Sequence, residues 1–140
     1  MALELQLGGV LRQAMIVSYT TSVGGSPKLI FRNGTKPSSC TAADAGTMLA
    51  ILTLPATWVS SATGITTITN GPWSGTGATA GTITHYRLKD SAATASDNSG
   101  TTHEQGSCGT GTFDINLDNL VIAVGQTVSI ATWNRTQGGA

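Results

Sequence analysis

Short runs of alternating apolar and polar residues recur along the chain, and turn-forming residues separate them about every 8–15 residues. The clearest run lies near the middle of the chain, where Tyr86 and Leu88 alternate with His85, Arg87 and Lys89. Successive side chains of a β-strand point to opposite faces, so we expect Tyr86 and Leu88 to point inward and the three basic residues outward. No segment keeps the 3.6-residue period of an amphipathic helix over several turns. This pattern restricts the chain to a fold built from short strands.

The strand pattern predicts an all-β fold, an antiparallel β-sandwich or jelly roll of about eight to nine short strands. We divide the chain into an N-terminal arm (1–11), a β-sandwich domain (12–135) and a flexible tail (136–140). The expected strands cover residues 12–21, 28–32, 47–54, 65–69, 82–90, 101–108, 113–117, 120–124 and 127–133.

Half of the 140 residues are Gly, Ala, Ser or Thr, and acidic and basic side chains balance at seven each. A nucleic-acid-binding protein needs an excess of Lys and Arg, and a disordered chain needs a high net charge, so both classes are excluded. No apolar run approaches the ~18 residues that would span a bilayer, and the N-terminus lacks the basic start of a secretory signal. We therefore expect no nucleic acid or membrane partner, and synthesis in a cytoplasm.

The N-terminal arm contains three leucines, Leu3, Leu5 and Leu7, which alternate with the polar residues Glu4 and Gln6. A strand with this pattern has one apolar edge. Two interpretations stay open: the segment is a frayed terminus, or it is an arm that docks on a neighbouring subunit.

Residues that could carry chemistry are few and scattered. His103 and Glu104 are neighbours and would face opposite sides of a strand, so they cannot bind one metal ion together. Asp114 and Asp118 flank apolar residues in an alternating pattern, which favours a solvated strand face over a calcium loop. No nucleophile motif or zinc spacing occurs. The sequence predicts no enzyme, no cofactor and no metal site.

Two cysteines and three tryptophans remain. Cys40 and Cys108 are either free thiols or one disulfide, and the first interpretation is favoured because secreted disulfide scaffolds are usually short and rich in cysteine. Trp58 and Trp73 fall in expected loops, and Trp133 lies on the strand face opposite Val128 and Ile130. The tryptophans either close the ends of the sandwich or bind a sugar or a protein partner.

Six segments between residues 28 and 133 form a recognisable set. They are Lys28-Leu-Ile-Phe-Arg-Asn-Gly-Thr-Lys-Pro37, Ala45-Gly-Thr-Met-Leu-Ala-Ile-Leu-Thr-Leu54, Gly81-Thr-Ile-Thr-His-Tyr-Arg-Leu-Lys-Asp90, Gly106-Ser-Cys-Gly109, Asp114-Ile-Asn-Leu-Asp-Asn119 and Val124-Gly-Gln-Thr-Val-Ser-Ile130. Taken together they resemble small structural proteins encoded near the capsid genes of tailed bacteriophages, the jelly-roll cement (decoration) proteins of these capsids, and the resemblance covers residues 28–133.

The resemblance implies a β-sandwich on the outside of an HK97-type capsid shell, where it would tie capsomers together without catalysis or cofactor. The implied partners are the major capsid protein and further copies of this chain, and a dimer is expected because closed two-fold dimers are the commonest oligomers. The candidate interface residues are Leu3, Leu5, Leu7, Trp58, Trp73, His85, Arg87, Lys89 and Trp133.

A second hypothesis is a carbohydrate- or receptor-binding β-sandwich module of a phage tail fibre or adhesin. In that case Trp58 and Trp73 would be the platforms on which sugar rings stack.

Overall fold

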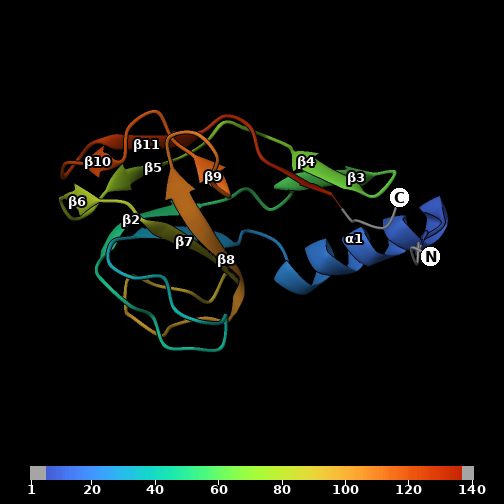
Figure 1. The fold of residues 1–140 in the computed structure, drawn as a ribbon, viewed down its shortest axis with the longest axis horizontal. Helices are drawn as coiled ribbons and strands as arrows, with labels where there is room; N and C mark the ends of the chain where they lie inside the picture. Colours follow the sequence, from blue (N-terminus) through green and yellow to red (C-terminus); the bar gives the residue numbers. More distant parts are fainter. Residues whose placement is uncertain (1–5, 137–140) are drawn as a thin grey trace, which may run out of the picture.

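The computed structural model describes residues 6–136 of the chain, and it is mostly β, with curled antiparallel sheets in a sandwich-like arrangement (Figure 1). The predicted all-β sandwich class is therefore confirmed. The described elements are α1 (Gly9–Val23), β1 (Lys28–Arg32), β2 (Met48–Thr53), β3 (Val59–Ala62), β4 (Ile65–Ile68), β5 (Trp73–Gly77), β6 (Gly81–Thr82), β7 (His85–Lys89), β8 (Thr102–Gly109), β9 (Ile115–Asn116), β10 (Val121–Ile122), β11 (Thr127–Ile130) and β12 (Asn134–Thr136).

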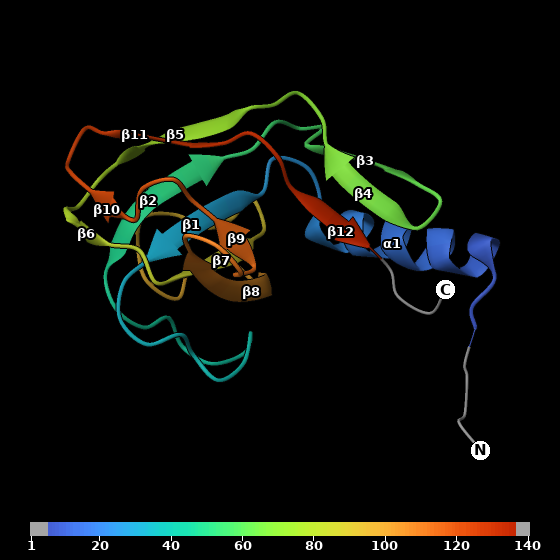
Figure 2. The ribbon, with the colours of Figure 1, turned by 45° about the horizontal axis from the view of Figure 1, so that its top comes forward.

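The main sheet has seven strands in the order β11-β5-β2-β1-β7-β8-β9. Its strand pairs are antiparallel, except for the short parallel pair between β8 and β9. Strands β10 and β6 form a two-stranded sheet. Figure 2 shows β9 across β1 and β7, whereas β11 runs beside its partner β5 at the other edge of the same sheet. Residues from both edges pack on one core, so the curled sheet closes on itself.

The apolar core lies between the central strands and the late strands. Register places Leu29 of β1 opposite Leu88 of β7, and Phe31 opposite Tyr86, all on one face of the sheet. These four residues are at most 2 % exposed. Side chains from the late strands that pack on the same core include Ile115, Leu117, Ile122, Val128 and Ile130.

Two long loops cover the opposite face of the central strands. Residues 33–47 connect β1 to β2, and residues 90–101 connect β7 to β8; both run beneath the sheet in Figure 1. The first loop closes tightly where Gly46 meets Asn33. Gly46 has φ +69°, and a Cβ on it would lie 1.9 Å from the Asn33 carbonyl oxygen, so only glycine fits there.

A smaller unit extends from the sandwich, and it combines α1 with a three-stranded sheet of order β12-β4-β3 (Figure 1). We call this unit the arm module. Gln13 of α1 fixes the helix to the β3–β4 hairpin, since its Nε2 donates to the Ser61 carbonyl at 3.1 Å and its Oε1 accepts from Gly64 N at 2.9 Å.

The expectation of a β-rich run over residues 12–21 is wrong, because this segment lies within α1. Ile16 and Val17 favour a strand locally, but the preceding Leu, Arg, Gln, Ala and Met are good helix formers. Ile16 and Val23, seven residues apart, are the two buried apolar residues of the helix. That spacing returns to the same helical face and is the signal that the strand interpretation missed.

Candidate functional site

The three basic residues expected to point outward from β7 are buried. His85, Arg87 and Lys89 alternate with Tyr86 and Leu88 as predicted, but they are only 0 to 2 % exposed. The prediction of opposite faces is confirmed, and the prediction of a solvent-facing basic row is wrong. The cover comes from the two long loops, so these residues present no surface to a partner.

Asp44, from the loop 33–47, is the central residue of this buried charged face. Its Oδ1 lies 2.8 Å from Arg87 Nη1, and its Oδ2 lies 2.7 Å from Lys89 Nζ. All three side chains are at most 3 % exposed. Asp44 Oδ2 also accepts from Asn98 N of the second loop at 2.6 Å. One carboxylate therefore joins both loops to β7.

The environment of Asp44 favours its ionised form. Burial alone would raise its pKa, but hydrogen bonds from Lys89 and from the Asn98 backbone, together with the charge of Lys89, outweigh burial. The result is a pKa of about 2. Asp44 therefore stays charged at neutral pH and compensates the two cations that it contacts.

The other N–H groups of Arg87 donate to acceptors in the loop 33–47 and in β8. It donates to the carbonyls of Ser39 and Ala42, each at 3.0 Å, and to Gln105 Oε1 at 3.0 and 3.2 Å. Gln105 in turn donates to the Pro37 carbonyl at 2.8 Å. A hollow of about 350 Å³ opens beside Arg87, Lys89 and Asp44. The bonding pattern of this face is that of a structural cluster, in which a charged side chain replaces the apolar contacts of an ordinary core.

His85 is fully buried beside this cluster. Its Nδ1 lies 3.1 Å from Thr84 Oγ1, and its Nε2 has no partner among the described residues. Burial lowers the pKa of His85, and the positive charges of Arg32 and Arg87 lower it further. The imidazole is therefore held neutral, and its expected role at an exposed interface does not fit this position.

The three tryptophans form one buried cluster between the sandwich and the arm module. Trp58, Trp73 and Trp133 are 3, 2 and 6 % exposed, and their ring centroids lie 5.2 to 5.9 Å apart. Tyr19 of α1 adds a fourth ring, 6.4 Å from Trp58. The sequence left open whether the tryptophans pack inside the protein or bind a sugar or a protein partner, and their burial favours packing inside the protein. The rings offer no platform to a sugar, so the carbohydrate-binding hypothesis loses the residues on which it depends.

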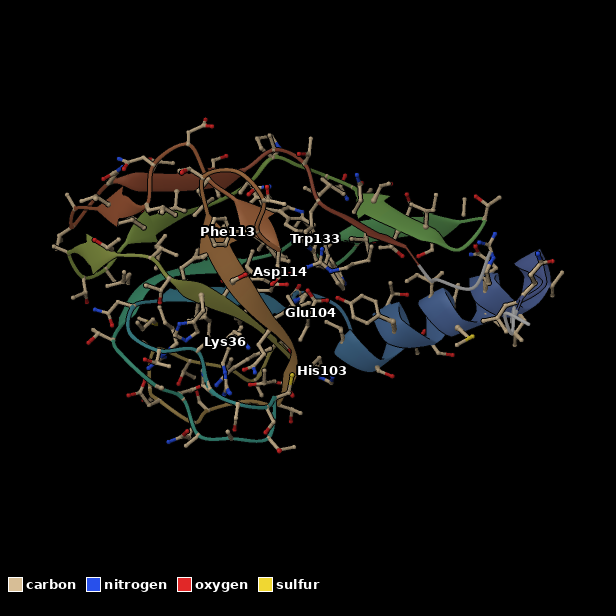
Figure 3. All side chains as sticks on the ribbon, in the orientation of Figure 1. Lys36, His103, Glu104, Phe113, Asp114 and Trp133 are labelled. Atoms are coloured by element: carbon tan, nitrogen blue, oxygen red, sulfur yellow. The ribbon has the colours of Figure 1, made fainter. Side chains whose placement is uncertain are left out.

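Glu104 of β8 lies on the polar side of the contact between the sandwich and the arm module, which we call the junction. It accepts hydrogen bonds from the Tyr19 hydroxyl at 2.6 Å, from the Tyr86 hydroxyl, and from Arg135 Nε at 2.9 Å. Arg135 stacks over the Trp133 ring at 4.4 Å. Figure 3 shows Glu104 and Trp133 between the sandwich and α1. Sequence reasoning assigns Glu104 no such role, because its partners come from three other elements, α1, β7 and β12.

The two tyrosines of this junction act as permanent donors. Burial raises the pKa of Tyr19 and of Tyr86, and the negative charge of Glu104 raises both further. Both hydroxyls therefore stay protonated and point their hydrogens at Glu104. The junction ties one helix, two strands of the sandwich and β12 together through a single carboxylate.

Other predicted residues lie as follows. Asp114 and Asp118 are exposed while Ile115 and Leu117 between them are buried, so the alternation is confirmed there. The expected strand over 113–117 shortens to Ile115–Asn116, and Phe113 is exposed. Cys40 and Cys108 are free thiols. Leu3 and Leu5 lie outside the described residues, and Leu7 is half-buried just before α1. Among residues 6–136, no group of three or more His, Cys, Asp or Glu side chains could hold a metal ion.

The exposed surface of α1 is the remaining candidate for a functional site. Val10, Leu11, Met15 and Val17 are 89, 51, 40 and 42 % exposed, and Ala14 between them is also exposed. We call these five residues the apolar face of α1. In the part of the chain that the structure describes, no helix is long and apolar enough to cross a membrane. Exposed apolar side chains gathered on one helix in this way mark a surface that a partner can cover.

Comparisons with known proteins add no assignment: no family model, no curated protein and no solved structure matches the chain.

Proposed function

We propose that this protein is a structural virion protein that binds the outer surface of a tailed-phage capsid and cements adjacent capsomers. Its partners would be the major capsid protein and further copies of itself. In this proposal the protein is made in the cytoplasm of the bacterial host, acts on the capsid exterior, and has no catalytic role, cofactor, nucleic acid ligand or membrane contact.

The observation that carries the proposal is the apolar face of α1. Apolar side chains exposed in one contiguous group are costly in water, and such patches mark surfaces that a partner covers. Here the patch lies on the arm module, which projects from the sandwich (Figure 1). An exposed apolar surface of this kind suits a protein that assembles with others.

Two further features support a place on a capsid. The segments between residues 28 and 133 resemble the cement proteins, and the sandwich fold agrees with the fold that this resemblance implies. The chain also has no net charge, so it would not be drawn to packaged DNA. On a symmetric shell each contact can be weak, because neighbouring contacts raise the effective concentration for the next one.

The test is binding to purified capsid shells that lack the protein. We expect the protein to co-sediment with bare shells at a fixed number of copies per shell, and the decorated shells to withstand a higher temperature before they break. Shells already saturated with the protein are the control and should take up no more. Absence of co-sedimentation with both unexpanded and expanded shells would refute the proposal.

A further inference from the structure

The hollow between the two long loops and β7 is lined by charged side chains that do not balance. Arg87 and Lys89 each bring one positive charge to it, whereas Asp44 is the one negatively charged side chain among its described lining residues. Asp44 touches both cations but supplies a single negative charge. The nearby Arg32 is matched by its own partner Asp97 and does not change this sum. One positive charge is therefore left over in the hollow.

The hollow is buried at its base and open at its rim. Its three charged side chains are at most 3 % exposed, whereas the loop residues Thr41, Asn98 and Thr101 that also line it are exposed. Its volume of about 350 Å³ lies at the small end of the range for ligand pockets. Water screens a buried charge less than an exposed one. The hollow therefore admits a small molecule and places it beside a weakly screened positive charge.

Lys89 keeps a hydrogen-bond donor for such a molecule. Two of its three ammonium N–H groups donate to Asp44 Oδ2 at 2.7 Å and to the Ser99 carbonyl at 3.0 Å. The third has no acceptor among residues 6–136. By contrast, the five N–H groups of Arg87 are all engaged by protein acceptors. Lys89 can therefore contact a ligand directly, while Arg87 contributes only its charge.

Asn98 adds two more donors at the rim, and Asp44 fixes their direction. Asn98 Oδ1 accepts from Asp44 N at 2.8 Å, and Asn98 N donates to Asp44 Oδ2 at 2.6 Å. With Oδ1 engaged in this way, the two N–H groups of Asn98 Nδ2 have no acceptor among the described residues. The same exchange holds Asn98 at φ +61°, a conformation that asparagine adopts more readily than most residues. The hydroxyls of Thr101 and Thr102 line the same space. Donors are thus in excess where positive charge is in excess.

We propose that this hollow binds a small tetrahedral oxyanion, either inorganic phosphate or the phosphate group of a small ester. Lys89 Nζ and Asn98 Nδ2 donate to its oxygens, and the anion balances the surplus charge. Lysine is a common phosphate ligand because its ammonium acts as a compact point charge. Several donors around one space suit an anion with several acceptor oxygens better than chloride, which is a single acceptor atom. The bound anion links the loop 33–47 to the loop 90–101, and its binding does not depend on the proposed function.

Titration of the isotope-labelled full chain with sodium phosphate, followed by NMR at constant ionic strength, locates the site. We expect saturable shifts of the amide signals in the loops 33–47 and 90–101 and of the Asn98 side-chain amide, while the signals of α1 stay in place. Sodium chloride is the control for screening. Absence of saturable shifts in these loops, or equal shifts with chloride, would overturn the proposal.

Phenyl phosphate, titrated in the same way, distinguishes the two sources of the oxyanion. Tighter binding than that of inorganic phosphate supports the site and assigns it to an ester. Weaker binding supports the site and assigns it to the free ion.

A matched pair of variants tests the donors. Asn98→Asp removes the two amide N–H groups but keeps the Oδ1 atom that Asp44 N contacts. We expect the Kd for phosphate to rise about tenfold or more, because a hydrogen bond to a charged group is lost and a carboxylate now faces the anion. Asn119→Asp is the control, since Asn119 is also exposed, its Oδ1 accepts from Val121 N at 3.0 Å, and it lies outside the hollow. Equal weakening in both variants would show a long-range effect of net charge and would overturn the site.

Lys89→Gln tests the surplus charge itself. The variant leaves Arg87 and Asp44 as a balanced pair, so saturable phosphate binding should disappear. Retention of wild-type affinity by a folded Lys89→Gln protein contradicts the proposal. If this variant does not fold, the Asn98→Asp comparison and the titration of the unmodified chain still decide the question, because neither alters the buried charges.

Discussion

The central strands β1 and β7 have two faces that are buried in different ways. On one face Leu29 and Leu88 pack among apolar side chains from the late strands. On the other face Arg87 and Lys89 are equally buried, but their cover consists of loops, and Asp44 supplies the contacts. Apolar packing distributes stability over many weak contacts, whereas the charged face concentrates it in one carboxylate. The difference predicts that the two faces fail differently when they are mutated.

The largest effect is expected for Asp44→Ala. Removal of the carboxylate leaves Arg87 and Lys89 buried without a counter-charge, and breaking a buried pair in this way costs about 3–5 kcal/mol. Urea unfolding of the variant measures this loss in the free energy of unfolding. Asp118→Ala is the matched control, because Asp118 is an exposed aspartate; its loss should be at most about 0.5 kcal/mol. Equal losses in the two variants would remove the special role of Asp44.

The second-largest loss of stability is expected for Leu88→Ala, on the apolar side of the central strands. Leu88 is 0 % exposed, and truncation of a buried leucine costs about 2–5 kcal/mol through lost burial and the cavity that remains. The contrast with Asp44→Ala appears when unfolding is repeated at high salt. The loss in Leu88→Ala should not change with ionic strength, and a salt-dependent loss would contradict a purely apolar face.

The sequence alone predicts the burial of the apolar side of the central strands, but it does not predict the burial of the charged side. Alternation correctly places Tyr86 and Leu88 inside, since a strand has only two sides and apolar residues mark the inner one. Burial of Arg87 is not predictable from its own strand. Its partner Asp44 lies 43 residues earlier, in a loop whose path no local pattern specifies. The pattern of β7 alone therefore assigns the basic residues to solvent.

The junction with the arm module shows the same limit. Three tryptophans can be recognised as unusual in a sequence, but that they gather in one cluster depends on how the arm module meets the sandwich. The apolar face of α1 is not predictable for a different reason. Ile16 and Val17 favour a strand locally, and this obscures the helical spacing of the residues that face the protein.

A third prediction concerns Glu104, which the register with Leu88 places as a charged residue on the apolar face. Glu104→Gln keeps one acceptor but loses the charge that Arg135 and the two tyrosine hydroxyls contact. We expect a loss of about 1–2 kcal/mol, since hydrogen bonds to charged groups are the stronger ones. Hydrogen exchange should show faster opening of α1 than of β7, because Tyr19 loses its anchor. Uniform acceleration over both elements would contradict a local role at the junction.

The smallest effect is the response to pH, and it separates the two faces without any mutation. The folded pKa of Asp44 is about 2, below the model-peptide value of 3.8, so the folded state favours the ionised carboxylate. Its contribution is complete above about pH 4 and is lost as pH falls toward 2. His85 has a lowered pKa, so the unfolded chain binds more protons below the ordinary value of 6.5, and stability decreases from that point downward.

Unfolding free energies measured from pH 8 to pH 2 should therefore fall in two steps, the upper one below the ordinary histidine value of 6.5 and the lower one below the ordinary aspartate value of 3.8. His85→Asn should remove the upper step, and Asp44→Asn the lower one, while Leu88→Ala should shift the whole curve down without changing its shape. Both groups take up protons when the chain unfolds at low pH, because both have a lower pKa in the folded state. Both steps therefore lower the free energy of unfolding as the pH falls, although one group is a base and the other an acid. A curve in which Leu88→Ala abolishes either step would mean that the charged face depends on the apolar packing behind it, and the two faces would have to be treated as one cooperative core.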